Sequence, residues 1–246
     1  MMKDKKIVAI IQAHMSSTRL PEKVLRDLCG APALYRMLER LRQCKLLDDI
    51  VIATSVEPCD DILIEKCQEW GIHTFRGSDS DVLSRYWGAA QAYPADVYVR
   101  ITSDNPLIDP GHMDDQIRFF LDHDYRYVAC DEETTPNGIG GEVFTAELMK
   151  ECAENSTEGY EHEHVTPYMY TKQDSKYYYK FQQDSAYRIT LDTPEDYEVI
   201  SKIFEEFYPK NPAFTIHDVL AYLREHPELV AVNSMIHQKG FMEGYE

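Results

Sequence analysis

Residues 10–23 read Ile10-Ile11-Gln12-Ala13-His14-Met15-Ser16-Ser17-Thr18-Arg19-Leu20-Pro21-Glu22-Lys23, an apolar run that ends in a polar and basic turn. The run begins at Ile7 and predicts a buried strand, and the small residues after it let the backbone approach a ligand closely. Backbone N–H groups in such a turn can bind phosphate oxygens, and Arg19 and Lys23 can neutralise them. The segment is therefore a candidate phosphate-binding loop, although similar basic turns also occur on ordinary protein surfaces.

Strand and helix patterns alternate through the first half of the chain. Apolar runs typical of buried strands are followed by hydrophobic residues at helical spacing, and Gly71 is placed to end one of these helices. This alternation predicts a layered α/β fold with a mainly parallel central sheet. The expected strands lie at residues 7–11, 50–53 and 97–101, and the expected helices at residues 34–41, 62–70 and 82–90.

The second half of the chain has a different pattern. Strand-like segments at residues 127–130, 142–144 and 177–181 are separated by irregular chain. We expect some of these strands to be antiparallel, which makes the sheet a mixed one, and to cover the substrate or contact a second subunit.

Two helices are expected near the end of the chain. Thr193 followed by Pro194 and Asp196 is a helix start, with Thr193 as the N-cap and a carboxylate in the first turn. A last helix is expected around residues 219–223.

Length and composition limit the number of domains, the kinds of partner and the cellular location that we expect. The 246 residues contain no Pro/Gly/Ser-rich linker or internal repeat, so we expect one domain over residues 1–246, with an acceptor-side or dimerisation subregion at approximately residues 125–190. The formal net charge of −18 argues against nucleic-acid binding, which needs a basic face.

The cysteines and the apolar runs indicate the cellular location. Six cysteines without a CxxC pair indicate reduced thiols. No apolar run approaches the about 20 residues that span a bilayer, and no signal-peptide pattern is present, so we expect a cytoplasmic protein.

Four further motifs follow residues 10–23. With that segment, they give a chain that resembles the acylneuraminate and 3-deoxy-manno-octulosonate cytidylyltransferase superfamily, in the branch named after a spore-coat polysaccharide protein. The resemblance implies a three-layer Rossmann-like nucleotidyltransferase fold of the nucleotide-diphospho-sugar transferase type. The four motifs are Arg76-Gly77-Ser78-Asp79-Ser80-Asp81-Val82-Leu83-Ser84-Arg85, Arg100-Ile101-Thr102-Ser103-Asp104-Asn105-Pro106-Leu107-Ile108-Asp109-Pro110, Glu163-His164-Val165-Thr166-Pro167-Tyr168 and Leu191-Asp192-Thr193-Pro194-Glu195-Asp196.

Transfer of a nucleotidyl group demands a site that handles many negative charges. The protein must neutralise charge on the α-phosphate and on the departing pyrophosphate. Mg²⁺ does this with one or two carboxylates, phosphate oxygens and waters. Asp104 and Asp192 are a plausible pair, and the resemblance implies that they hold the metal. The alternative interpretation is that each is only a polar residue in a turn: Asp104 could cap the turn before Asn105-Pro106, and Asp192 lies immediately before the N-cap Thr193.

The resemblance also implies which residues bind the substrates. Arg19, Lys23, Asp104 and Asp192 are the catalytic candidates, with the two cations on the triphosphate. Asp81 can instead cap the helix that begins near Val82, and Arg100 can instead pair with a buried carboxylate. The nucleotide-binding candidates are Gln12, Ala13, His14, Ser16, Ser17, Arg19, Lys23, Arg76, Gly77, Asp81, Arg85 and Asp104, and the substrate-binding candidates are Arg100, Glu142, His162 and His164.

The chain departs from the family pattern at two histidines. The relatives usually carry arginine where this chain has His14 and His162, and a neutral histidine is a weaker, pH-dependent partner for an anion. The run Glu161-His162-Glu163-His164 lacks the further ligands of a zinc site. The glycine-rich residues 137–142 are expected to form a turn, or a lid over the acceptor.

We therefore expect a Mg²⁺-dependent cytidylyltransferase that joins CMP to an acidic or modified sugar and releases pyrophosphate, in surface polysaccharide or glycan precursor biosynthesis. The alternatives are transfer to a phosphorylated or phosphonate acceptor, a metal-dependent glycosyltransferase of similar fold, and a nucleotide-binding protein without turnover. A homodimer is expected, with the aromatic residues 177–181 at the contact. An internal strand over the chain's own core is the other interpretation of that segment.

Overall fold

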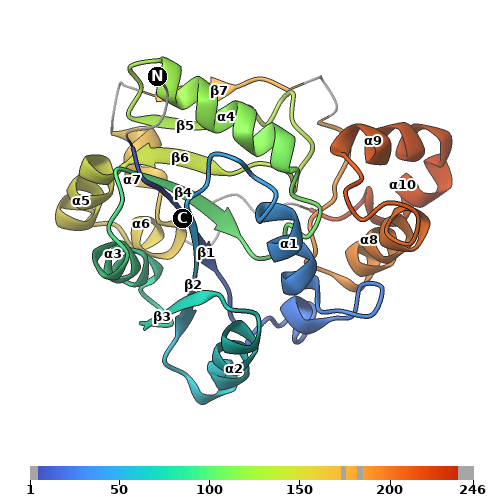
Figure 1. The fold of residues 1–246 in the computed structure, drawn as a ribbon, viewed down its shortest axis with the longest axis horizontal. Helices are drawn as coiled ribbons and strands as arrows, with labels where there is room; N and C mark the ends of the chain where they lie inside the picture. The colour runs from blue at the N-terminus through green and yellow to red at the C-terminus, as the bar shows by residue number, and fades with distance from the viewer. Residues whose placement is uncertain (1–4, 173–175, 182–184, 238–246) are drawn as a thin grey trace.

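A seven-stranded sheet forms the centre of the computed structural model, which describes residues 5–172, 176–181 and 185–237 (Figure 1). In spatial order its strands are β3 (His73–Gly77), β2 (Asp49–Ser55), β1 (Ile7–Gln12), β4 (Val97–Thr102), β6 (Glu142–Thr145), β5 (Tyr127–Cys130) and β7 (Lys176–Tyr179). Strands β1 to β4 are mutually parallel, β6 is antiparallel to both β4 and β5, and β7 is parallel to β5. The predicted α/β fold with a mainly parallel mixed sheet is confirmed.

Helices cover both faces of this sheet and complete the three layers. Along β1, Ile7, Ala9 and Ile11 belong to one hydrophobic core, whereas Val8 and Ile10 belong to a second core on the opposite face. Both faces are buried, which is why the strand is a continuous apolar run. The helices that pack on the first core are α1 (Ala33–Leu41), α2 (Asp61–Glu69) and α4 (Pro110–Asp122), and those that pack on the second are α3 (Val82–Ala92), α5 (Ala146–Asn155) and α7 (Pro167–Thr171), with α6 (Gly159–His164) against α3.

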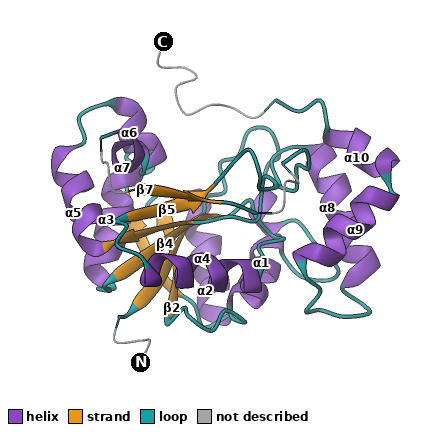
Figure 2. Cartoon of the chain, turned by 90° about the horizontal axis from the view of Figure 1, so that it is seen from above, coloured by secondary structure: helices purple, strands orange, loops and turns teal. Residues whose placement is uncertain are grey.

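Three C-terminal helices form a separate layer at one end of the molecule (Figure 2). They are α8 (Pro194–Phe207), α9 (Ile216–Glu225) and α10 (Pro227–Asn233). Their apolar faces share a third core with Leu20, Leu28 and Leu107, which lie in the loops that follow β1 and β4. The C-terminal helices therefore pack directly on the loops at the carboxyl ends of these two strands.

The order of the strands creates a position for a ligand. From β1 the chain proceeds to β2 and β3 on one side, and then crosses back to β4 on the other side of β1. In open α/β sheets, ligands bind at such a reversal, beyond the carboxyl ends of the strands. Here that edge carries the loop 13–22, the short 3-10 helix η1 (Lys23–Leu25) and the loop after Thr102.

Two local expectations are confirmed and one boundary is corrected. Thr193 caps α8 through its hydroxyl, which accepts from the Asp196 N–H at 3.2 Å, and Asp196 returns the bond in a capping box. Gly71 adopts a φ of 65°, which glycine accommodates without strain. The last strand ends at Tyr179 and not at Phe181.

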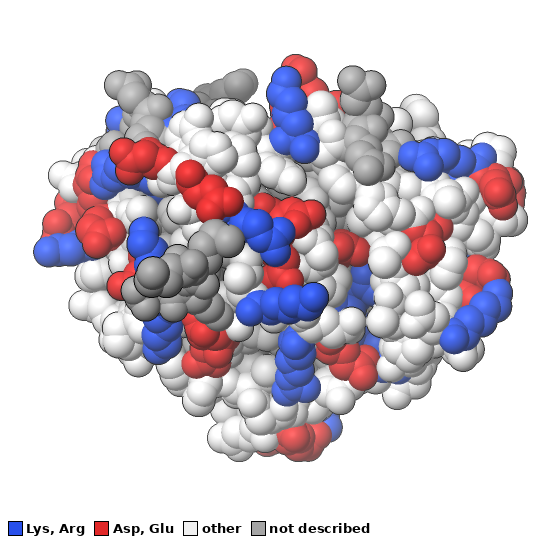
Figure 3. Space-filling view, turned by 45° about the horizontal axis from the view of Figure 1, so that its top comes forward, with Lys and Arg blue, Asp and Glu red and all other residues white. Residues whose placement is uncertain are grey.

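Charged side chains are mixed over the surface that Figure 3 shows. Lysine and arginine side chains stand singly or beside carboxylates on that face, and they do not merge into one continuous basic area there. Among the helices in the described part of the chain, none has the length and apolar character that a membrane crossing requires.

Candidate active site

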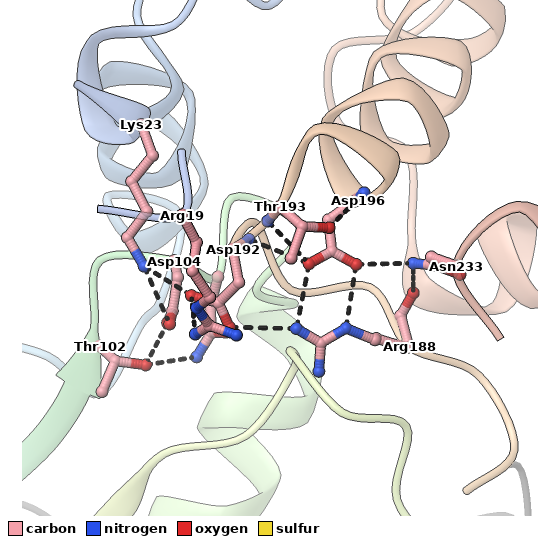
Figure 4. Close-up of polar contacts among 10 residues, drawn as sticks. Arg19, Lys23, Thr102, Asp104, Arg188, Asp192, Thr193, Asp196 and Asn233 are labelled. Carbon is pink, nitrogen blue, oxygen red and sulfur yellow. Dashed lines mark hydrogen bonds and ion pairs between the residues drawn. The ribbon is translucent and has the colours of Figure 1, made fainter. Parts of the chain in front are cut away.

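A cluster of carboxylates and cations lies at the carboxyl ends of β1 and β4, beside the start of α8 (Figure 4). Lys23 Nζ donates to Asp192 Oδ1 at 2.7 Å and lies 3.4 Å from Asp104 Oδ2. Arg19 Nη2 lies 3.3 Å from the same oxygen of Asp192. The Leu191 N–H donates to the backbone carbonyl of Asp104 at 2.8 Å, which joins the two loops. The structure thus brings together the four residues predicted to be catalytic.

Asp104 is oriented by the end of its own strand. Thr102, the last residue of β4, donates from its hydroxyl to Asp104 Oδ1 at 2.5 Å. Asn105 Nδ2 in turn donates to Thr102 Oγ1 at 3.2 Å. Because one carboxylate oxygen is held by Thr102, the other is directed toward Lys23.

Asp192 has a third cationic partner, Arg188, which the sequence analysis did not identify. Arg188 Nη2 lies 3.1 Å from Asp192 Oδ2, while Lys23 and Arg19 contact Oδ1. The two oxygens of this carboxylate therefore face different cations. Arg188 stands in no recognised motif, and the only signal in the sequence was a cation four residues before the aspartate.

Asp196 does more than the capping that was predicted for it. Its carboxylate is fully buried and accepts from Arg188 Nε at 2.9 Å and from Arg188 Nη2 at 3.0 Å. Asn233, at the end of α10, donates to it at 2.9 Å. The backbone N–H groups of Asp192 and Thr193 also donate to it, each at 3.1 Å. Asp196 thus joins the C-terminal helices to the loop that carries Asp192.

The charges in this cluster are maintained by their mutual contacts. Burial alone would raise the pKa of Asp192, but Lys23, Arg19 and Arg188 outweigh it and hold this pKa below its ordinary value. Burial alone would lower the pKa of Lys23, but Asp104 and Asp192 outweigh it and raise that pKa. Both groups are therefore charged at neutral pH.

The loop after β1 is held in shape by Asp60, a residue that sequence reasoning missed. The Met15 N–H donates to Asp60 Oδ1 at 2.7 Å, and the hydroxyls of Thr54 and Ser55 donate to Oδ2 at 2.9 and 2.5 Å. Asp60 is 1% exposed and lies in the short 3-10 helix η2 (Pro58–Asp60) after β2. The Ala13 N–H donates to the Ala53 carbonyl at 3.2 Å. Neighbouring strands thus fix the backbone of the candidate phosphate loop.

Within this loop, His14 and Ser16 contact each other. His14 Nδ1 lies 2.8 Å from Ser16 Oγ. Burial, and then the positive charge of Lys23, lower the pKa of His14 below its ordinary value of about 6.5. The ring is therefore neutral at pH 7 in the ligand-free protein. Gln12 turns toward Arg100 at the end of β1, and Ser17 precedes Arg19 in the same loop.

We predict that His14 makes triphosphate binding depend on pH. A bound triphosphate favours the protonated ring, so the pKa of His14 is higher in the complex than in the free protein. In the pH range between these two pKa values, CTP binding is therefore accompanied by the uptake of a proton. The affinity for CTP should therefore fall as the pH rises through that interval, which begins below 6.5. The His14→Arg variant should bind CTP more tightly and should lack the part of the pH dependence that comes from His14. Because CTP itself titrates, the measurement is the difference between the two pH profiles by calorimetry, and parallel profiles would show that His14 does not contact the triphosphate.

The second segment predicted to bind the nucleotide, residues 76–85, lies across β2 from the cluster. Arg85 is 3% exposed, and its Nη1 donates to the Ser78 carbonyl at 2.6 Å. Gly77 makes room for it, because a Cβ there would lie 3.0 Å from the Arg85 side chain. Arg76 donates to the Ser55 carbonyl at 2.8 Å and pairs with Asp61 at 2.6 Å. In the ligand-free protein these arginines shape the segment, and their nucleotide contacts stay a prediction.

The structure brings together Asp81 and His162, which the sequence analysis assigned to different substrates. Asp81 caps α3 by accepting from the Ser84 N–H at 2.9 Å, so the alternative interpretation of Asp81 describes the ligand-free state. His162 Nδ1 lies 3.0 Å from Asp81 Oδ1. This hydrogen bond raises the pKa of His162 above its ordinary value. The pair connects α6 to the first turn of α3, and neither residue is part of the carboxylate cluster.

A row of polar side chains crosses four strands on the face that carries α3 and α5. Arg100 of β4 forms an ion pair with Glu142 of β6. This contact agrees with the alternative interpretation of Arg100, in which it pairs with a buried carboxylate. Arg100 Nη2 also donates to Gln12 Oε1 at 3.2 Å, and the Tyr127 hydroxyl donates to Glu142 Oε1 at 2.5 Å. Burial opposes the charge on Arg100, but Glu142 outweighs it and raises the pKa of the guanidinium. The charge of Arg100 is therefore already balanced.

His164 lies near this row, whereas its neighbour Glu161 has a structural role. Burial lowers the pKa of His164 and outweighs the opposing charge of Glu163, and the charge of Arg100 adds to the lowering, so the ring is neutral at pH 7. Glu161 is fully buried and accepts from the Thr157 N–H at 2.8 Å at the start of α6. Among the described residues, no group of three or more His, Cys, Asp or Glu side chains is arranged to hold a metal.

The glycine-rich residues 137–142 connect to the segment that leads to Asp192. The Asn137 N–H donates to the Tyr187 carbonyl at 3.0 Å, and the Ile189 N–H donates to the Asn137 carbonyl at 2.8 Å. Gly138 has a φ of 122°, and a Cβ there would lie 2.7 Å from the backbone of Ile189. The expected turn is therefore a tight backbone contact beside the segment containing Arg188.

Comparisons with known proteins agree on one family. A family model described as Cytidylyltransferase matches residues 8–226. The chain is 36% identical over 235 residues to the spore coat polysaccharide biosynthesis protein SpsF of Bacillus subtilis (strain 168), which covers 90% of this chain and 95% of that protein. It is 35% identical over 243 residues to an uncharacterized protein of Methanocaldococcus jannaschii, covering 97% and 98% of the two chains.

A solved structure has the same architecture. It is a cytidylyltransferase from Leptospira borgpetersenii serovar Hardjo-bovis (strain JB197), which is 33% identical to this chain. The two structures superpose with a TM-score of 0.87 over 95% of this chain and 99% of that one.

Proposed function

This chain belongs to the cytidylyltransferase family and is a CTP-dependent nucleotidyltransferase, and we propose that it transfers CMP to an acidic or modified sugar and releases pyrophosphate. The observation that carries the proposal is the convergence of Arg19, Lys23, Asp104 and Asp192 at the carboxyl ends of β1 and β4. The relationship to a polysaccharide biosynthesis protein supports a role in forming surface polysaccharide or glycan precursors.

The donor set of the cluster fits a Mg²⁺ ion. Asp104 Oδ2 and Asp192 Oδ1 both face one cationic nitrogen, Lys23 Nζ, so the two carboxylates already converge on a positive charge. Two carboxylates that share their ion with phosphate oxygens and waters are typical of Mg²⁺. Arg19, Lys23 and Arg188 balance Asp104, Asp192 and Asp196 in the free protein. Movement of Arg19 and Lys23 to a triphosphate would leave two negative charges, which one divalent ion would balance.

In the proposed reaction, Asp104 and Asp192 would hold Mg²⁺, which when bound supplies positive charge against the phosphates. Arg19 and Lys23 bind the triphosphate and stabilise the charge that develops on pyrophosphate. The acceptor oxygen forms a bond to the α-phosphorus, and the bond from that phosphorus to the bridging oxygen breaks. Pyrophosphate leaves with the electron pair of that bond, and the proton of the acceptor hydroxyl passes to water.

The polar row supports a sugar as the acceptor. Arg100 is already balanced by Glu142, so the row offers carboxylate, hydroxyl and amide groups, with a neutral His164 beside it. Such groups suit the hydroxyls of a sugar better than a dianionic phosphate, which needs unbalanced cations. Roles for Arg100, Glu142 and His164 in acceptor binding are part of this proposal, whereas His162 would act through Asp81.

The homodimer stays a prediction. Tyr177 and Tyr179 pack against the first core, as the interpretation of an internal strand required, while Tyr178 is 43% exposed on the opposite face of β7. Strand β7 lies at the end of the sheet. The ring of Tyr177 packs beside those of Phe119 and Tyr125, with centroid distances of 4.6 and 5.2 Å. This aromatic edge is the surface that we propose for the contact.

Nucleotide specificity tests the proposed function. At a concentration of one hundred times Kd, CTP should stabilise the native state by about 2.7 kcal/mol. For a chain of this size, that corresponds to a rise in Tm of roughly 5–10 °C. ATP, GTP and UTP at the same concentration should give smaller shifts. Pyrophosphate release should then be screened with CTP against acidic sugars, sugar phosphates and phosphonates, and equal thermal shifts with all four nucleotides would remove cytidine from the assignment.

A further inference from the structure

We propose that Arg188 is a positioning residue that makes Asp192 a one-oxygen ligand and thereby sets the preference of the site for Mg²⁺ over Ca²⁺. The inference rests on the proposed metal role of Asp104 and Asp192. None of the motifs that identify the family in this sequence includes Arg188.

The first support is that the two oxygens of the Asp192 carboxylate contact different cations. Its Oδ1 faces Lys23 at 2.7 Å and Arg19 at 3.3 Å, which is the side of the phosphate loop. Its Oδ2 faces Arg188 at 3.1 Å on the opposite side. When Arg19 and Lys23 leave for the triphosphate, Oδ1 becomes free and Oδ2 stays bonded.

The second support is the rigidity of Arg188 itself. Its side chain is 9% exposed, and two of its nitrogens contact the fully buried carboxylate of Asp196 at 2.9 and 3.0 Å. Asn233 Nδ2 donates both to Asp196 and to the Arg188 carbonyl, at 2.9 and 3.0 Å. The guanidinium is planar and its donors are fixed relative to one another, so a side chain locked on Asp196 also has a defined position at Asp192.

The third support is that Asp196 also holds the backbone of the ligand. It accepts from the N–H groups of Asp192 and Thr193, each at 3.1 Å. The same carboxylate thus fixes both the main chain of Asp192 and the cation on its outer oxygen. Rotation of the Asp192 carboxylate to present both oxygens to one ion would break the contact with Arg188.

This constraint distinguishes between metals. Ca²⁺ takes six to eight oxygen ligands and commonly binds a carboxylate through both oxygens, whereas Mg²⁺ demands a small octahedral shell. A carboxylate with one available oxygen therefore serves Mg²⁺ and denies Ca²⁺ a ligand. Groups that orient a metal ligand typically change metal affinity by about 10- to 100-fold when they are altered.

The test compares Arg188→Lys with Arg36→Lys, the same change at another buried arginine, which pairs with Glu39. Lysine keeps the positive charge and can pair with Asp196, but it lacks the fork that reaches both carboxylates. Arg36→Lys also replaces a buried guanidinium by an ammonium, but the side-chain partners of Arg36 are Glu39 and Tyr208, so Arg188, Asp192 and Asp196 keep their contacts. Mn²⁺ binding is followed by electron paramagnetic resonance in the presence of CTP, with Mg²⁺ and Ca²⁺ as competitors. We expect Arg188→Lys to shift the ratio of the two competitor affinities toward Ca²⁺ by about tenfold, and Arg36→Lys to leave it unchanged.

The outcomes separate this inference from the proposed function. A folded Arg188→Lys protein with the wild-type ratio of affinities would overturn the role of Arg188 while the metal site stands. Wild-type protein that binds CTP but no divalent ion would instead overturn the metal role, and the inference with it. If Arg188→Lys does not fold, the double variant Arg188→Gln, Asp196→Asn removes both charges together and must show the same shift toward Ca²⁺, because a wild-type ratio in it would equally overturn the inference.

Discussion

Asp104→Asn should lower the rate of CMP transfer by on the order of 10²- to 10³-fold, the loss that follows removal of one group that stabilises charge in a transition state. The substitution removes a negative oxygen from the proposed metal site and keeps nearly the same shape. Lys23 lies 3.4 Å from this carboxylate and would retain its shorter contact with Asp192. We therefore expect little loss of thermal stability.

Asp192→Asn should lose activity to a similar extent but also lose stability. Its carboxylate is 5% exposed and is contacted by Lys23, Arg19 and Arg188. Removing one partner from a buried pair leaves an uncompensated charge, which costs about 3–5 kcal/mol when the pair is fully buried. The Arg19 side chain is 43% exposed, so the cost should be toward the lower end of that range.

A matched control separates chemistry from folding in both variants. Asp114 on α4 is 7% exposed and accepts from the Lys45 and Leu46 N–H groups, away from the cluster. Asp114→Asn should lower Tm and leave the turnover of the folded fraction unchanged. The measurements are Tm, and pyrophosphate release at several Mg²⁺ concentrations. Near-normal turnover of Asp104→Asn or Asp192→Asn at low Mg²⁺ would remove that aspartate from the metal role.

Lys23→Met should change two properties in opposite directions. In the ligand-free protein the ammonium lies between Asp104 and Asp192, so it competes with any divalent cation for the same oxygens. Two unit charges about 4 Å apart interact by about 4 kcal/mol near a protein surface, so even partial relief allows a rise of roughly tenfold in metal affinity. Loss of the cation from the triphosphate should at the same time reduce turnover by on the order of 10²-fold.

The comparison with Lys23→Arg makes this prediction specific. Arginine keeps the positive charge, so metal affinity without nucleotide should stay close to the wild-type value. Binding of Mn²⁺ is measured first without CTP, and CTP turnover is measured separately. A Lys23→Met protein that loses both metal affinity and turnover would show that Lys23 supports the fold of the cluster and does not exchange with the metal.

The sequence was sufficient for those elements whose signals are local. β1, β2 and β4 are buried on both faces, so each is a short apolar run that can be recognised alone. The capping box at Thr193 and Asp196 spans four consecutive residues, which fixes the start of α8. By contrast, β3 is an edge strand of intermediate and exposed residues and has no such run.

Several helices were missed although their local signals were present. Asp109 caps α4 and is followed by Pro110, the same arrangement that identified α8, and Thr145 caps α5. The helix α10 has seven residues, too few for a clear period. In these helices the run of regularly spaced hydrophobic residues is short or interrupted. Most of their stability comes from packing on the sheet or on the other helices, and not from helix propensity.

The sequence alone sufficed for the fold class, through its alternating strand and helix patterns, and for the family. It also led to the prediction of four catalytic residues, because each lies in a short motif. The contacts of each carboxylate depend on the tertiary structure. Arg100 meets Glu142 because β6 pairs with β4 in one register, and Asp81 meets His162 because α6 packs on α3. Lys23 and Arg19 meet one oxygen of Asp192 because the loop after β1 lies beside the start of α8, while Arg188 contacts the other oxygen and Asp196. A charge in a sequence has no partner until folding brings distant segments together, so the division of Asp192 between two sets of cations could be read only from the folded chain.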